Sequence, residues 1–267
     1  MPRIEELSDG RTRVIVGSAV KHVIPPVIKI PTKLKPAFQA SIIVPVYNEA
    51  DIISRTLLCL SRYLGPDYEL IVCDDASTDG TCDVLKNLTH ENSNIRLLGL
   101  DKRIGKGGTI KRAVEIANSD VIVYVDADLS ASLDDLPRLL ESASKKDALV
   151  ISRRTIRGRL TQGVPRLTLS IGYNLIVRLI FRTGIRDHQC GFKAMRKEVA
   201  KQLIAKTSND GFVFDTELIV RAKKMGIPVE EVEIDWIERR PKRANTKWLR
   251  TSIEMMKDLI VLKENLS

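Results

Sequence analysis

Residues 121–128 read Val-Ile-Val-Tyr-Val-Asp-Ala-Asp, an apolar and mostly β-branched run followed at once by two aspartates. A short run of this composition is typical of a strand that is buried on both faces of a parallel sheet. Ligands of open parallel sheets bind beyond the carboxyl ends of the strands. The stretch therefore predicts a central strand over 121–125 that brings Asp126 and Asp128 to a binding edge.

The sequence on both sides repeats this unit, because short apolar runs alternate with amphipathic stretches. We expect strands at 41–47, 68–73, 95–98 and 148–152, with helices at 49–63, 79–88, 107–118 and 133–144. The second half is less regular, with strands expected at 191–194 and 229–237 and helices at 197–206, 215–225 and 248–263. Alternating strands and helices indicate βαβ units, so the predicted class is α/β with a mostly parallel sheet.

The first 38 residues are expected to form an N-terminal extension, followed by a single domain over 39–267. Prolines at 25, 26, 31 and 36 interrupt the extension, and proline disfavours helix interiors and central strands. Residues 13–16 could form an edge strand.

The composition favours an anionic partner but not nucleic acid. The chain has 267 residues, a formal net charge of +9 and only 4% aromatic residues. This charge suits phosphorylated ligands or an anionic membrane. Nucleic-acid binding is not expected, because few aromatic side chains are available for stacking and none is interleaved with basic residues. The four cysteines form no C-x-x-C pair, which indicates buried reduced thiols in a cytosolic protein.

Carboxylates follow other expected strands as well, at Glu49 and at Asp74-Asp75. Like charges gathered at one edge repel one another, and a divalent cation with a bound nucleotide would relieve the conflict. Mg²⁺ and Mn²⁺ prefer oxygen ligands and commonly use one or two carboxylates plus substrate phosphates. A D-x-D triplet is often only a solvated turn, but its place after a buried strand favours metal binding by Asp126 and Asp128.

A glycine-rich turn, Gly105-Lys-Gly-Gly108, precedes an expected helix. Glycines let a backbone approach a phosphate, and a helix N-terminus attracts anions. The spacing is not that of a P-loop. A flexible loop with a solvated lysine is the alternative.

These motifs together resemble family-2 glycosyltransferases over about residues 40–260. The chain has Val44-Pro-Val-Tyr-Asn-Glu49, Asp74-Asp-Ala-Ser-Thr-Asp-Gly-Thr81, Gly105-Lys-Gly-Gly108 and Asp126-Ala-Asp-Leu129 in that family's order. Two later motifs, Arg186-Asp-His-Gln-Cys-Gly-Phe-Lys193 and Phe214-Asp-Thr-Glu-Leu218, are similar to the dolichyl-phosphate glucosyltransferase and mannosyltransferase branch. The resemblance implies a GT-A nucleotide-sugar-binding fold for 39–267, with acceptor-side helices at its C-terminal end. It also implies inverting transfer of glucose or mannose from a UDP- or GDP-sugar to a polyprenyl (dolichyl) phosphate.

The resemblance also implies roles for single residues. The nucleobase and ribose pocket would be lined by Pro45, Tyr47, Glu49, Asp74 and Asp75, and Lys106 would approach the donor. Asp126 and Asp128 would hold Mg²⁺ or Mn²⁺ with the diphosphate, Asp128 being counted as catalytic. Some relatives place a metal-binding glutamine where this chain has Ser130.

Two basic clusters follow expected strands, at 153–157 and at 239–247. Arginine offers planar, multi-donor recognition of phosphate oxygens, so we expect an acceptor-phosphate pocket here. A solvated loop is the alternative for any one of these residues. The expected set is Arg153, Arg154, Gln189, Arg240, Arg243 and Lys247, with Arg153 also counted as catalytic.

Asp215 decides between two mechanisms. A hydroxyl acceptor needs a general base, whereas a phosphate monoester is already anionic near neutral pH. Asp215 stands where hydroxyl-using relatives keep their base, and we expect it to position basic side chains or a sugar hydroxyl; capping its helix is the structural alternative. The rival functions are transfer to a saccharide hydroxyl with Asp215 as base, and a nucleotide-binding module without turnover. The D-x-D and the basic clusters argue against the latter.

The segment 165–181 is apolar but contains Arg166 and Arg178. We predict a helix lying in a membrane interface, with an ordinary buried helix as the alternative. The chain contains no run of roughly 18 uncharged apolar residues, so no transmembrane helix is expected. Residues 1–13 lack the apolar core of a signal peptide. The expected location is the cytoplasm, at the cytosolic face of a membrane.

Overall fold

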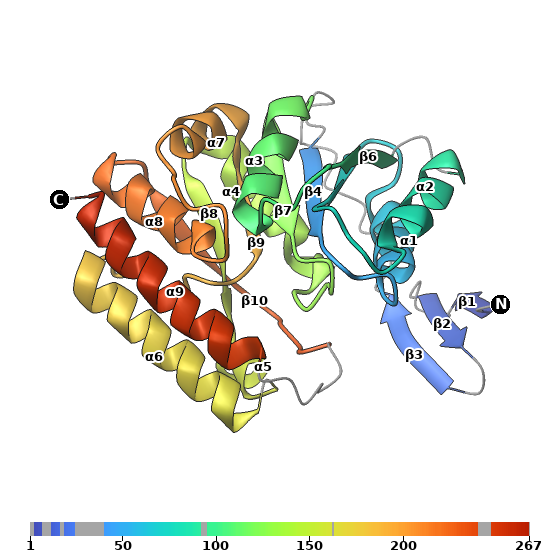
Figure 1. Cartoon of the computed structure of the whole chain (residues 1–267). Helices are drawn as coiled ribbons and strands as arrows, with labels where there is room; N and C mark the ends of the chain where they lie inside the picture. Colours follow the sequence, from blue (N-terminus) through green and yellow to red (C-terminus); the bar gives the residue numbers. More distant parts are fainter. Residues whose placement is uncertain are drawn as a thin grey trace.

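The computed structural model describes residues 3–6, 12–16, 19–24, 40–91, 95–161, 163–239 and 247–266. Its main sheet has the strand order β10-β8-β9-β7-β4-β5-β6 (Figure 1). These strands are β4 (Ala40–Val46), β5 (Glu69–Asp74), β6 (Ile95–Gly99), β7 (Val121–Val125), β8 (Leu149–Arg154), β9 (Phe192–Arg196) and β10 (Val229–Ile234). The α/β class and the positions of the predicted strands are confirmed.

The sheet is parallel except at β9, which pairs antiparallel with both β7 and β8. The register sets Val125 opposite Phe192 and Val121 opposite Arg196. Because β9 begins where β7 ends, the segment just before β9 lies at the same edge as the residues just after β7. This reversal brings the motif that ends in Lys193 to the binding edge.

Helices cover both faces of the sheet and give it a separate core on each side. One face carries α1 (Ile53–Leu64), α2 (Thr81–Glu91), the short η1 (Leu133–Asp135) and α4 (Leu136–Lys145). The other carries α3 (Lys106–Ile116), α7 (Lys197–Ile204) and α8 (Phe214–Lys224). The apolar positions of each helix pack on the sheet, as Leu57 and Leu60 of α1 do with 0% exposure.

Several element boundaries differ from the prediction, and for two of them the structure shows the cause. Helix α1 begins at Ile53 rather than at 49, because Asn48 has a positive φ of 55° and the amide of Glu49 donates to Thr81 Oγ1 over 2.9 Å. Strand β10 ends at Ile234 rather than at 237, and Trp236 forms an isolated bridge with Ala131 instead. Both ends are therefore set by contacts with distant residues.

Helices α6 (Val164–Phe181) and α9 (Lys247–Glu264) lie side by side, coloured yellow and red in Figure 1. Tyr173 and Val177 of α6 pack against Met255 and Leu259 of α9 in a third apolar cluster. Within the described residues, α6 is the one helix long and apolar enough to cross a membrane by length and composition, with a mean hydropathy of 1.3. Only 17% of it is buried, so the buried-helix alternative is wrong. The short helix α5 (Ile156–Leu160) precedes it.

The N-terminal strands β1 (Arg3–Glu6), β2 (Thr12–Val16) and β3 (Ala19–Ile24) form a separate antiparallel sheet in that order. The expected strand at 13–16 exists, but it lies in the middle of this sheet and not at an edge. The neighbouring strands β1 and β3 were not predicted, because their mixed polar and apolar residues give little periodicity. The division of the chain into an extension and one domain stays a prediction.

Candidate active site

The turn that carries both aspartates is held from three sides. The Asp126 amide donates to the Gly191 carbonyl over 3.1 Å, and the Ser130 amide donates to Asp128 Oδ1 over 3.0 Å. Thr56 of α1 donates its hydroxyl to the Ala127 carbonyl over 2.5 Å. The sequence therefore folds into a fixed D-x-D turn at the end of β7, as predicted.

Gly191 lies against one of these aspartates. A Cβ built on Gly191 would stand 2.1 Å from Asp126 Oδ2, which is far inside the contact distance. Any larger residue at 191 would therefore displace the Asp126 carboxylate from this position. Sequence reasoning did not single out this glycine, although the Cys-Gly-Phe-Lys motif contains it.

A network of buried charges joins this turn to α8. Lys106 Nζ lies 2.8 Å from Asp126 Oδ1 and 2.9 Å from Asp215 Oδ2. Lys193 Nζ lies 2.6 Å from Asp215 Oδ1, and the Tyr124 hydroxyl donates to the same oxygen over 2.7 Å. Lys193 is 0% exposed and Asp215 is 2% exposed. The network thus places Asp215 between two ammonium groups, one of which also contacts Asp126.

The electrostatics of this network favour an ionised Asp215. Burial by itself would raise the pKa of Asp215, but the ammonium groups of Lys106 and Lys193 hold that pKa below its usual range. The expectation that Asp215 contacts basic side chains agrees with this geometry. Lys193 was not predicted, and its place directly after Gly-Phe in the acceptor-side motif was the available signal.

The glycine turn has a packing role that sequence reasoning did not foresee. Gly105 has a φ of +92°, and a Cβ there would lie 2.5 Å from the Asp210 carbonyl oxygen. A Cβ on Gly107 would lie 2.5 Å from Phe214 Cβ. The two glycines let α3 approach the segment that leads into α8. This close approach puts Lys106 beside Asp215.

The residues expected to line the nucleoside pocket lie at or just after the ends of β4 and β5. Pro45, Tyr47 and Glu49 are partly exposed, whereas Asp74 and Asp75 are each 3% exposed. Asp75 accepts the amides of Ile104 and Gly105 over 2.7 and 2.9 Å, so it holds the loop before Lys106.

Asp74 and Tyr47 each make a further contact near these strand ends. Asp74 accepts the amide of Ser77 over 3.2 Å and so holds the turn after β5. The guanidinium of Arg103 lies 3.9 Å from the centroid of the Tyr47 ring. Arg103 was missed by sequence reasoning, because it stands in a polar loop without a motif. It places a cation on the one aromatic ring expected near the nucleoside.

The expected phosphate-binding arginines at the end of β8 are engaged by carboxylates. Arg154 is 8% exposed and binds Asp187 through two contacts of 2.6 and 2.9 Å. Arg159 Nη2 lies 3.3 Å from the same carboxylate, whose pKa is held low against the opposing effect of burial mainly by Arg154. Arg153 is more accessible and pairs with Glu233 over 2.5 Å. Arg154 is thus positioned to hold the loop before β9, while Arg153 lies at the surface.

The remaining acceptor residues are only partly described. Gln189 Nε2 lies 3.7 Å from Met255 Sδ, which links the acceptor-side loop to α9. Arg240 and Arg243 lie outside the described residues, as does the side chain of Lys247, the first residue of α9. Their expected phosphate contacts stay predictions.

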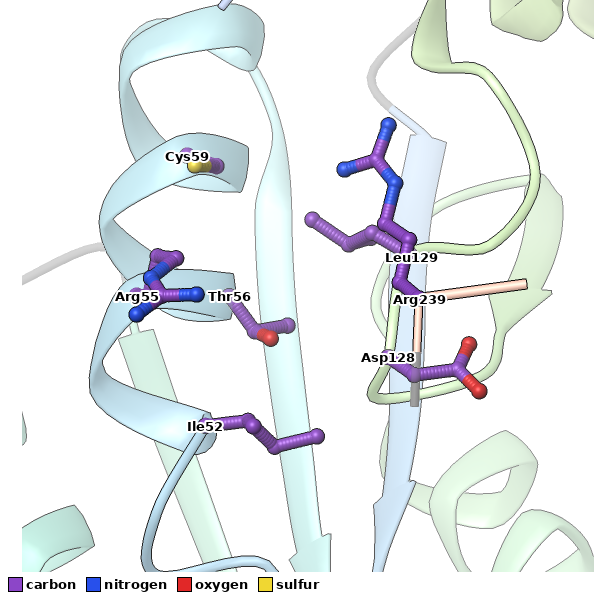
Figure 2. A pocket seen from close by; sticks show the side chains of 7 residues that line it. All are labelled: Ile52, Arg55, Thr56, Cys59, Asp128, Leu129 and Arg239. Atoms are coloured by element: carbon purple, nitrogen blue, oxygen red, sulfur yellow. The ribbon is translucent and has the colours of Figure 1, made fainter. Parts of the chain in front are cut away.

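A pocket beside Asp128 brings in a residue that was not predicted (Figure 2). One face of α1 forms one wall, and the D-x-D turn with Arg239 forms the other. The lining residues are Ile52, Arg55, Thr56, Cys59, Asp128, Leu129 and Arg239. Arg55 was missed because an arginine on an amphipathic helix resembles an ordinary solvated residue. Burial raises the pKa of the Cys59 thiol, so this cysteine is a neutral residue on the α1 side of the pocket.

The donor set at this turn fits a hard divalent cation. Among the described residues no group of three or more His, Cys, Asp or Glu side chains forms a metal site. Mg²⁺ and Mn²⁺ do not need one, because they commonly bind one or two carboxylates and complete their shell with waters and substrate phosphates. The Asp126 side chain is 42% exposed and can take part. The buried Ser130 hydroxyl has no hydrogen-bond partner in the described part of the chain and adds an oxygen next to Asp128.

Known proteins similar to this chain share its fold. Glucosyl-3-phosphoglycerate synthase from Mycobacterium tuberculosis, solved with Mn²⁺, UDP and glucosyl-3-phosphoglycerate, matches with a TM-score of 0.61 at 21% identity over 85% of this chain and 80% of that one. The mannosyltransferase PcManGT from Pyrobaculum calidifontis, solved with GDP-Man and Mn²⁺, matches with a TM-score of 0.55 at 22% identity over 80% of this chain and 61% of that one. Both support the predicted GT-A fold.

Curated relatives are similar in sequence. Glycosyltransferase AglD from Haloferax volcanii is 36% identical over 223 residues, which are 77% of this chain and 35% of that protein. The chain thus spans about a third of this relative's length. Dolichyl-phosphate beta-glucosyltransferase from Dictyostelium discoideum is 30% identical over 241 residues, which are 84% of this chain and 73% of that protein. Residues 41–204, which include the D-x-D turn, Lys106 and Lys193, match the family description "Glycosyl transferase family 2", and the chain belongs to this family.

Proposed function

We propose that this chain is a metal-dependent, inverting glycosyltransferase that moves a hexose from a UDP- or GDP-sugar to the phosphate of a polyprenyl lipid. The family supports glycosyl transfer in general. Relatives named as dolichyl-phosphate beta-glucosyltransferases support a lipid phosphate acceptor and favour glucose over mannose. Structural neighbours crystallised with Mn²⁺ and UDP or GDP-Man support the donor and the cation.

The hydrogen bonds and the ionisation of Asp215 support the assignment of a phosphate acceptor. Its two carboxylate oxygens already accept hydrogen bonds from two lysines and a tyrosine, and its pKa lies below the usual range. A carboxylate held this way is a poor proton acceptor. A general base has to accept a proton readily, so Asp215 does not suit that role. A phosphate monoester needs no base, because its oxygen is already anionic. Asp215 therefore favours the phosphate acceptor over the saccharide hydroxyl.

The other residues then have consistent tasks. Asp126 and Asp128 would hold the divalent cation, which would neutralise charge on the departing diphosphate. Lys106 lies next to this turn and can contribute a charge-assisted contact to the same diphosphate. Arg153, Gln189, Arg240, Arg243 and Lys247 remain the proposed acceptor-phosphate contacts. In this proposal Arg154 positions the loop around Asp187 and does not bind the phosphate itself.

The paired helices supply the proposed contact with a membrane surface. Apolar side chains on α5, α6 and α9 that are exposed include Leu160, Val164, Leu179, Ile253, Ile260 and Val261. An exposed apolar face bordered by arginines suits the boundary between headgroups and acyl chains. A lipid acceptor also has to reach the enzyme from such a surface. The cytosolic side of that membrane stays a prediction.

The function is tested by radiolabelled transfer from UDP-glucose and GDP-mannose with Mn²⁺ in detergent micelles. We expect label in organic-extractable polyprenyl phosphate and little label on soluble saccharides. Transfer to saccharide hydroxyls with an unused lipid phosphate would refute the acceptor assignment.

The membrane contact is tested separately by cosedimentation with anionic vesicles. Leu179→Glu should reduce binding, since a carboxylate then enters the apolar face where Leu179 is 70% exposed. Gln202→Glu adds the same charge to the exposed surface of α7 and serves as the matched control. Equal binding by wild type and both variants would exclude α6 from the contact.

A further inference from the structure

Lys106 contacts the Asp126 carboxylate, which is proposed to bind the metal ion. Its ammonium lies 2.8 Å from Asp126 Oδ1 and 2.9 Å from Asp215 Oδ2, and its side chain is only 13% exposed. Asp126 is one of the two carboxylates proposed to bind the cation. A divalent cation on Asp126 and a lysine ammonium on the same carboxylate repel each other.

The charges around the turn show when this repulsion can be relieved. Three carboxylates, Asp126, Asp128 and Asp215, face the ammonium groups of Lys106 and Lys193, and the Arg239 guanidinium lies near Asp128, so the charges balance. A divalent cation alone would leave two positive charges in excess. A diphosphate that enters with the cation offsets this excess and offers Lys106 new anionic oxygens.

The structure also allows Lys106 to leave its present partners. Asp215 would keep Lys193 at 2.6 Å and the Tyr124 hydroxyl at 2.7 Å, so it would remain paired. Lys106 is the first residue of α3, and its long side chain has several rotatable bonds. A shift of this side chain from Asp126 to a phosphate therefore leaves the remaining network satisfied.

We propose that Lys106 competes with the divalent cation for Asp126, so that the metal binds firmly only together with the nucleotide diphosphate. This inference rests on the metal and donor of the proposed function. It gives Lys106 a second task besides contact with the donor, namely to prevent the metal from binding tightly without nucleotide.

The test is a titration with Mn²⁺ followed by the electron paramagnetic resonance signal of the free ion, with and without UDP or GDP. Lys106→Met removes the competing charge, and Lys106→Gln does so with a polar side chain if the methionine variant does not fold. Lys102→Met removes the same charge from an exposed residue just before the glycine turn and is the matched control. Circular dichroism and thermal melts establish that each variant is folded.

Without nucleotide, Lys106→Met should bind Mn²⁺ roughly tenfold tighter or more, while Lys102→Met should resemble wild type. Nucleotide should tighten Mn²⁺ binding strongly in wild type and much less in Lys106→Met, because the competitor is already gone. Unchanged or weaker Mn²⁺ binding by folded Lys106→Met and Lys106→Gln overturns the competition. If UDP and GDP fail to tighten Mn²⁺ binding in wild type, the donor assignment of the proposed function fails, and the nucleotide-free titration still decides the competition.

Discussion

Replacing Asp215 by asparagine distinguishes a counter-charge from a catalytic base. In the folded protein Lys193 is 0% exposed and depends on Asp215, at 2.6 Å, for its negative partner. In Asp215→Asn the Lys193 ammonium keeps only neutral hydrogen-bond acceptors such as the Cys190 carbonyl, whereas Lys106 keeps Asp126. Removing one partner of a buried ion pair costs about 3–5 kcal/mol. For a domain of this size the melting temperature should fall by roughly 10 °C.

A second substitution tests whether the unpaired ammonium is the cause. Lys193→Met in the Asp215→Asn background removes the stranded charge and should recover most of the lost stability. Urea unfolding of wild type, both single variants and the double variant gives the coupling energy, which we expect to exceed about 2 kcal/mol. The reasoning is refuted if Asp215→Asn melts like wild type while kcat falls by orders of magnitude and the acidic limb of its pH profile disappears. That pattern is the signature of a general base.

Three further predictions concern the metal turn and its support. Asp128→Asn should keep its melting temperature but lose Mg²⁺- or Mn²⁺-dependent transfer, and normal turnover would contradict the metal assignment. Gly191→Ala should weaken Mn²⁺ binding, because its Cβ would stand 2.1 Å from the Asp126 carboxylate, while Gly172→Ala, which meets nothing within 4 Å, should not. Burial lowers the pKa of His188 to about 4 in the folded protein. In the unfolded chain the same imidazole binds a proton near pH 6.5, so protonation favours the unfolded state. The unfolding free energy should therefore fall by up to about 3 kcal/mol as the pH drops from about 6.5 to 4, and the same pH dependence in His188→Gln would exclude this histidine.

The hydrogen bonds of the buried His188 ring determine which of its two nitrogens carries the proton in the neutral form. Asn174 Nδ2 donates to the Ser170 carbonyl over 2.8 Å, which leaves Asn174 Oδ1 as an acceptor. His188 Nδ1 lies 2.8 Å from that oxygen and therefore carries the proton, while Nε2 accepts from the Thr183 hydroxyl at 2.8 Å. Both ring nitrogens of His188 are thus used in hydrogen bonds within the fold. The same contacts tie α6 to the loop before β9.

The sequence by itself determined the order of strands and helices in the first half of the domain and which residues lie near the carboxyl end of each strand. Local hydrophobic period is enough for this, because burial on one or both faces leaves a pattern in neighbouring residues. It also placed Asp126 and Asp128 at the sheet's binding edge, since parallel strands share that edge. The α/β class, the GT-A fold and the family followed from the same motifs.

Only the tertiary structure decided which distant residues meet these aspartates. The antiparallel register of β9 on β7 carries Gly191 to Asp126 and Lys193 to Asp215, and no local period records that pairing. The pairing of Arg154 with Asp187 is also a contact between residues distant in the chain that no local pattern records. The exposure of α6 likewise depends on how little of it other elements cover, because an apolar helix has the same sequence pattern against a core or against a membrane.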